Sequence, residues 1–216
     1  FGQDLGAVAG VITAFTIGYA LVQPFFGPAG DRHGKYRVIT LSCIACTFAS
    51  LLCALAPDLR SLLVARVLAG MMAAGIIPLA MAWIGDVIPY EGRQPVLARF
   101  LIGQILGVAV GQLLGGFSAD YLGRQAPFLI AAALFALSSL LLWRQRARLP
   151  ATALTRQAAG PHQGLRHVLR EYAQVLQVPW ARIVLLTSLL EGAAVFGAFA
   201  FFAVHLHRTL GISLST

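Results

Sequence analysis

One short polar segment of this chain, residues 27–37, concentrates side chains that could form ion pairs. It holds one carboxylate and three cations, namely Asp31, Arg32, Lys35 and Arg37. A carboxylate accepts hydrogen bonds from several cations, and such charge-assisted bonds are among the strongest that side chains make. Gly27 and Gly34 flank the cluster and permit close backbone approach and unusual dihedral angles at each end of a tight connection. The segment could therefore latch adjacent helix ends together.

Long apolar stretches must position this segment. With 58% hydrophobic and only 11% charged residues, the chain has too little polar surface to cover a globule in water, so lipid must surround much of it. Crossing a hydrocarbon core about 30 Å thick takes roughly 20 helical residues. The stretches that meet this length are 5–30, 38–57, 61–85, 100–119, 125–143 and 183–207. Because these runs are continuous and do not alternate as barrel strands do, they predict an all-α, polytopic helical membrane protein with six transmembrane helices.

The basic residues predict how these helices are oriented. When the arginines and lysines are assigned to loops, twelve fall on one side and three on the other. Positive residues accumulate in short cytoplasmic loops, so we expect segments 27–37, 85–99 and 144–182 to be cytoplasmic, in an inner or plasma membrane. The net charge of +8 then reflects topology, and no nucleic-acid partner is expected.

Two ionisable residues lie inside apolar stretches. Arg66 follows Arg60 by about 9 Å of helical rise, and an arginine facing lipid there would cost roughly 2.5–3.5 kcal/mol even on the mildest scale. Arg66 should therefore face a cavity or a partner; the alternative is a structural role in which it snorkels outward. Glu191 lies about 13 Å beyond Arg182, where a carboxyl is expected to be protonated unless it is paired. Glu191 is thus a candidate proton carrier, or else a neutral acid hydrogen-bonded within its own bundle.

A polar segment at residues 144–181 divides the chain. Residues 1–143 are predicted to form an N-terminal bundle of five spans, and residues 182–216 the first helix and outer loop of a second bundle. Within the linker, apolar residues recur at helical spacing from 165 to 178. That periodicity predicts a short amphipathic helix at the inner membrane surface.

The pattern Gly27-x-x-x-Asp31-Arg32-x-Gly34-Lys35-x-Arg37 resembles the signature loop of the major facilitator superfamily. Other features lie where this resemblance places them: Arg66 followed by Gly70, the segment from Asp86 to Arg93, and a glycine series in the helix after it. The resemblance implies that the chain covers helices two to seven of a twelve-helix protein, without the first helix. It also implies that the loop braces the inner side of a transporter in its outward-facing state and must break for the transporter to open inward.

Asp86 and Arg93 are the expected partners of this gating loop. Tyr36 stands where the family usually has a second basic residue, so the latch is expected to be weaker or differently aimed. The alternative is a loop that only sets topology and has no moving part. By the same resemblance, an arginine at position 66 helps to couple proton movement or binds an anionic solute.

Glycines recur at every fourth position of the stretch 100–119. They are Gly103, Gly107, Gly111 and Gly115, with Gly116 beside the last. Small residues at this spacing line one helix face and let a neighbouring helix approach backbone to backbone. The run resembles the family's antiporter motif, but Gln112 stands where that motif has proline, so the expected kink is missing. Gln104 and Gln112 are among the few polar side chains expected to face a cavity.

The leading hypothesis is a secondary transporter that moves a small solute by alternating access, as proton-coupled efflux of drug or sugar type. Its expected partners are the lipid bilayer, a small solute and protons, and its expected state is a monomer. The other hypothesis is a non-transporting membrane scaffold or receptor on the same fold. No nucleophile, metal cluster or phosphate-binding loop stands out, and Cys43, Cys46 and Cys53 suit packing. Neither an enzyme nor a cofactor is therefore expected.

Overall fold

The structure, a computed structural model, describes residues 5–150, 154 and 165–210, with side chains for 10–118, 121–150, 154, 170, 172–195, 197 and 198. Helices account for the regular structure of these residues, and no strand occurs among them. The elements are α1 (Leu5–His33), α2 (Lys35–Leu55), α3 (Leu59–Ala73), α4 (Ile76–Val87), α5 (Tyr90–Tyr121), α6 (Ala126–Gln145), the 3-10 turn η1 (Arg146–Arg148), α8 (Leu165–Gln177) and α9 (Pro179–Leu210). The all-α prediction is confirmed.

Five segments of the described chain are long and apolar enough to cross a membrane. They are Gly10–His33, Lys35–Leu55, Leu59–Val87, Tyr90–Ser118 and Ala126–Arg148. Each contains or overlaps one of the first five predicted spans. The third is interrupted, since α3 ends at Ala73 and α4 begins at Ile76. The sixth predicted span falls within α9, where few side chains are described beyond Val195, and it stays a prediction.

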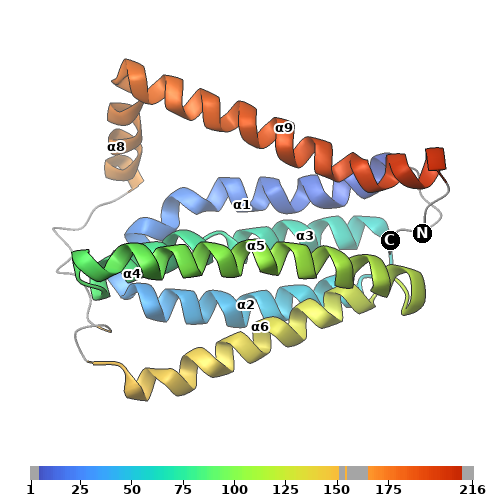
Figure 1. Ribbon diagram of the computed structural model, residues 1–216, viewed down its shortest axis with the longest axis horizontal. Helices are drawn as coiled ribbons and strands as arrows, with labels where there is room; N and C mark the ends of the chain where they lie inside the picture. Colours follow the sequence, from blue (N-terminus) through green and yellow to red (C-terminus); the bar gives the residue numbers. More distant parts are fainter. Residues whose placement is uncertain (1–4, 151–153, 155–164, 211–216) are drawn as a thin grey trace. The chain divides into compact units, whose positions relative to one another are not determined.

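The helices form two compact units, residues 1–159 and 160–216, which divide inside the predicted linker. In the first unit, α1 packs mainly along α3, and α2 packs mainly along α6 while also contacting α3 and α4. Figure 1 shows these helices running lengthwise. The second unit holds α8 and α9, with α8 turned across the start of α9 (Figure 1). The predicted helix at 165–178 is thus found as α8.

Small side chains dominate the buried core of the first unit. One cluster joins α2 and α3 through Ala49, Cys53, Ala56, Leu62, Ala65 and Ala69, and Phe15 of α1 packs against it. A second cluster joins α2 and α4 through Ile39, Cys43 and Leu79, with Phe26, Trp83 and Leu142 around it. Cys43, Cys46 and Cys53 are all buried free thiols, in keeping with a packing role.

A capping box begins α3, the helix that carries Arg66. Asp58 Oδ1 accepts a hydrogen bond from the Ser61 backbone N–H at 2.7 Å, and the Asp58 N–H donates to Ser61 Oγ at 3.3 Å. The backbone and side-chain hydrogen bonds from Ser61 lower the pKa of Asp58, because they stabilise its ionised form. This cap fixes where α3 starts and hence the height of Arg66 along it.

The segment 85–99, predicted as a polar loop, is mostly helical. Helix α4 continues to Val87 and α5 already begins at Tyr90, so the connection is only Ile88 and Pro89. The loop boundaries taken from hydropathy are therefore wrong here. Hydropathy marks where a helix leaves the lipid, whereas backbone hydrogen bonds and the placement of proline decide where the helix ends.

Candidate functional site

The predicted gating loop, residues 27–37, is also mostly helix, and the tight connection expected there is shorter than the predicted segment. Gly34 alone separates α1 from α2, with φ 90° and ψ 122°. The Gly34 N–H still donates to Gly30 O at 2.8 Å, and Gly34 O accepts from the Val38 N–H at 3.0 Å. A positive φ favours glycine, so Gly34 reverses the chain without a longer loop. Gly27 instead lies inside α1, and no heavy atom lies within 4 Å of a Cβ added there. Neither close backbone approach nor an unusual dihedral angle therefore explains this glycine.

Lys35 is the centre of the ion-pair cluster. Its Nζ lies 2.6 Å from Asp86 Oδ2 and 3.3 Å from Asp31 Oδ1. The Lys35 side chain is 14% exposed, whereas those of Asp31 and Asp86 are 48% and 34% exposed. One ammonium group thus joins the last turn of α1, the first turn of α2 and the end of α4. The sequence had suggested a carboxylate shared by several cations, and the structure shows a cation shared by two carboxylates.

The remaining arginines of the predicted gate form no ion pair with Asp31 or Asp86 in the described structure. Arg93 does not reach Asp31; its guanidinium donates to Gly85 O at 2.5 Å and to Ile88 O at 3.4 Å, and its Cζ lies 5.9 Å from the Tyr90 ring centroid. These carbonyls end α4, so Arg93 holds the turn between α4 and α5. Arg32 and Arg37 are exposed, and neither makes a side-chain hydrogen bond or ion pair with another described residue.

Tyr36 fastens the same end of the unit without using charge. It is 6% exposed, its hydroxyl donates to Leu142 O at 2.5 Å, and its ring centroid lies 5.3 Å from that of Trp83. These contacts join α2 to α6 and α4. In the sequence, Tyr36 stood out only as a departure from the family pattern. A large aromatic residue in a cationic position was the signal that it packs inward.

Replacing Tyr36 by phenylalanine tests this contact. Tyr36→Phe keeps the ring against Trp83 but removes the hydroxyl, and it is expected to lower the free energy of unfolding by about 1 kcal/mol. The effect should stay small because Leu142 O also accepts the Arg146 N–H. The measurement is thermal unfolding of the full-length protein in detergent. Tyr121→Phe is the control, since Tyr121 is 70% exposed and its hydroxyl bonds to no other described residue. Equal shifts for both variants would contradict the role of the hydroxyl.

Arg66 faces helix α1. Its Cζ lies 4.4 Å from the centre of the Phe15 ring, and its Nε donates to Val11 O at 3.4 Å. A cation–π contact of this kind stabilises a charge removed from water. Among the described residues, the partners of Arg66 are therefore an aromatic ring and a backbone carbonyl, and no acidic side chain pairs with it. Whether Arg66 couples protons or binds solute stays a prediction.

Two glycines let α1 and α3 approach each other at this point. A Cβ at Gly18 would overlap the carbonyl of Val67, and a Cβ at Gly70 would overlap the carbonyl of Phe15. Both positions are buried. Gly18 was not among the residues predicted from the sequence, and Gly70 was predicted only from its spacing to Arg66. The available signal was a pair of glycines inside two apolar helices, which favours close helix crossing in membranes.

The predicted glycine stripe on α5 has no neighbour in the described structure. No heavy atom lies within 4 Å of a Cβ built at Gly103, Gly107, Gly111 or Gly115. Gly116 and Gln104 are half-buried and Gln112 is exposed. Glu191 is exposed on α9, in the second unit. Helix packing at the stripe and the roles of Gln104, Gln112 and Glu191 stay predictions.

The comparison with known proteins agrees with this arrangement. Residues 1–216 match the Major Facilitator Superfamily. The chain belongs to that superfamily. The predicted resemblance is thereby confirmed, and the described helices are a partial bundle of that kind. Members are membrane-embedded transporters and not enzymes, so the protein is an integral membrane protein whose surroundings include the lipid bilayer.

Curated relatives in the superfamily carry transport and resistance names. Identity is 33% over 107 residues to the "Fatty acid resistance protein FarB" of Neisseria gonorrhoeae and 34% over 110 residues to the "Probable multidrug resistance protein EmrY" of Escherichia coli. It is 30% over 132 residues to the "Multidrug resistance protein MdtG" of Proteus mirabilis. These matches cover 50%, 51% and 61% of this chain but only 21%, 22% and 33% of the relatives. The chain therefore spans about a fifth to a third of the length of these relatives.

Proposed function

We propose that this chain belongs to a secondary active transporter that exports a small amphipathic solute by alternating access, driven by protons. The observation that supports this most is the position of Lys35 between Asp31 and Asp86, where one side chain ties three helix ends together. The resistance names of the relatives favour export. In this proposal the clustered end is cytoplasmic, the membrane is the cell's inner or plasma membrane, and the protein acts as a monomer.

The strength of the Lys35 cluster suits a gate that opens in every cycle. Exposed ion pairs contribute about 0–1 kcal/mol each, and both carboxylates here are about a third to a half exposed. Two conformations are both populated only when their free energies differ by no more than a few kcal/mol. A latch of two such pairs can bias the outward-facing state and still break. The Tyr36 bond to Leu142 would hold α6 in place while the ion pairs separate.

The solute and proton path would run through the bundle interior. In this proposal Arg66, set against Phe15, takes part in proton coupling or in binding an anionic group of the solute. Glu191 would carry the proton, and Gln104 and Gln112 would contact the solute. Gly103, Gly107, Gly111, Gly115 and Gly116 would pack against a further helix of the whole protein.

Solute flux in vesicles that contain the full-length protein tests this function. A fluorescent amphipathic cation and a long-chain fatty acid serve as probes, with and without a pH gradient. We expect outward flux of at least one probe that depends on the gradient. Arg66→Gln should lose that dependence, while Arg60→Gln, at an exposed arginine in the first turn of α3, should keep it. Absence of flux for both probes would favour a scaffold or receptor. Flux that does not change with the pH gradient would show that transport is not driven by protons.

A further inference from the structure

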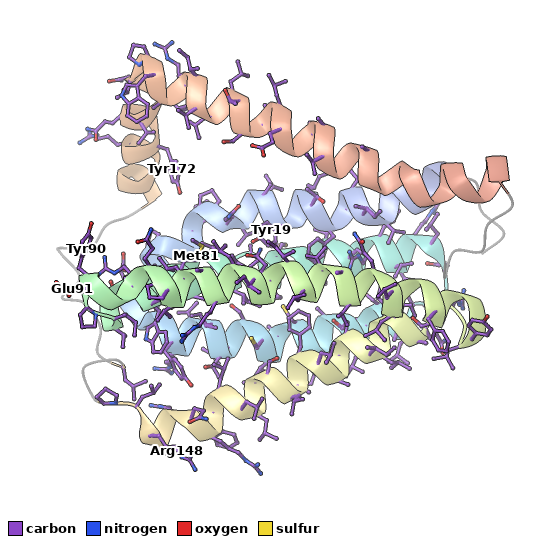
Figure 2. All side chains as sticks on the ribbon, in the orientation of Figure 1. Tyr19, Met81, Tyr90, Glu91, Arg148 and Tyr172 are labelled. Carbon is purple, nitrogen blue, oxygen red and sulfur yellow. The ribbon has the colours of Figure 1, made fainter. Side chains whose placement is uncertain are left out.

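Exposed positive charge gathers at the end of α6. The last turn of α6 and the following 3-10 turn carry Arg144, Arg146 and Arg148, and all of these side chains are exposed. None of the three guanidinium groups makes a hydrogen bond or ion pair with another residue in the described part of the chain. Figure 2 shows Arg148 at the end of α6, on the side away from the other helices of its unit.

The sequence on either side of this cluster supplies no counter-charge. No aspartate or glutamate occurs between Asp120 and Glu171, although the same stretch contains seven arginines. Of the other acidic residues near this end, Asp31 and Asp86 are engaged by Lys35. Glu91 is exposed in the first turn of α5 and forms no ion pair with these arginines in the described structure. Neutralising the arginines therefore requires solvent ions, another part of the whole protein or a separate anionic molecule.

Helix length places the cluster at the depth of lipid headgroups. From Ala126 to Trp143 the rise is about 27 Å, close to the hydrocarbon thickness of about 30 Å. Leu141 is 51% exposed and Trp143 is 68% exposed, so the outer side of α6 is apolar as far as Trp143 and basic directly after it. Tryptophan is enriched where the membrane meets water. This order of residues fits the boundary between acyl chains and phosphates.

We propose that Trp143, Arg144, Arg146 and Arg148 form a binding surface for the headgroups of anionic phospholipids. Arginine presents several N–H donors in a planar fork that matches phosphate oxygens, and the tryptophan packs at the level of the glycerol and upper acyl chains. The hydrogen bond from the Tyr36 hydroxyl to Leu142 O fixes Leu142, the residue before Trp143, to α2. The three arginines that follow are thereby held at one depth. The proposal rests on the cytoplasmic placement of this end in the proposed transporter, because the cytoplasmic leaflet carries a negative surface potential.

Lipid contact with the full-length protein tests this surface. The protein is placed in nanodiscs of phosphatidylcholine with and without phosphatidylglycerol, and spin-labelled lipids report which headgroup is enriched around it. We expect phosphatidylglycerol to be preferred over phosphatidylcholine, and each arginine should increase this preference by up to about 5-fold. The preference should weaken as the salt concentration is raised. The combined variant Arg144→Gln, Arg146→Gln and Arg148→Gln should lose most of it, and Arg60→Gln should keep it.

Other outcomes overturn the proposal. If the arginines only stabilise the C-terminal end of α6 through the helix dipole, the triple variant will be less stable but its lipid preference will not change. If inorganic phosphate displaces phosphatidylglycerol at equal concentration, the surface binds soluble anions and not lipid. The assay reads lipid contact in the absence of solute, so its result does not depend on whether the protein transports anything.

Discussion

Gly18→Ala and Gly70→Ala are each expected to destabilise the full-length protein by about 1–3 kcal/mol. The added methyl group would overlap a backbone carbonyl of the facing helix, of Val67 in the first case and of Phe15 in the second. A backbone atom cannot move aside as a flexible side chain can, so α1 and α3 must separate. Their separation would also pull Phe15 and Val11 away from Arg66. The effect is measured by thermal unfolding in detergent and by the yield of folded protein.

Gly10→Ala is the matched control, on the same helix as Gly18. An added Cβ at Gly10 would meet only Leu63 Cδ2 at 3.8 Å, an ordinary van der Waals contact. Since alanine is the better helix former, this variant should be neutral or stabilised by up to about 1 kcal/mol. A Gly70→Ala protein as stable as Gly10→Ala would show that α1 and α3 do not cross as closely as described.

Lys35→Met is expected to shift the proposed transporter toward its inward-open state by a factor of up to about 30. Two partly exposed ion pairs are worth up to about 2 kcal/mol together, and their loss leaves Asp31 and Asp86 without their shared cation. Turnover should fall as well, because the outward-facing state is less populated. Distances between labels on the inner ends of the two bundles of the full-length protein report the state, and solute flux reports turnover.

The geometry also ranks the two carboxylates. Asp86→Asn should have a larger effect than Asp31→Asn, because the Asp86 carboxylate lies closer to Lys35 Nζ, at 2.6 Å against 3.3 Å for Asp31. The Asp86 side chain is also less exposed, at 34% against 48%. Lys35→Arg, which keeps the charge, is the control and should stay close to the unaltered protein. If Asp31→Asn equals Lys35→Met, the hub of the cluster is Asp31 and not Lys35.

Much of this protein could be predicted from composition and spacing. Apolar stretches of about 20 residues define membrane helices because lipid offers backbone groups no hydrogen-bond partner, and this constraint is local. The positions of Asp31, Lys35 and Asp86 near helix ends were predicted for the same reason, since charges leave the hydrocarbon. The amphipathic period also predicted α8.

Only the tertiary structure decided which side chains meet. That Lys35 bridges two carboxylates, that Tyr36 reaches Leu142, and that Arg66 stacks on Phe15 all depend on how far each helix is rotated and shifted against its neighbours. Hydropathy is nearly uniform around these helices, so it does not fix those rotations. They are set by where backbones can touch, and Gly18 and Gly70 allow this between α1 and α3 because neither residue carries a side chain.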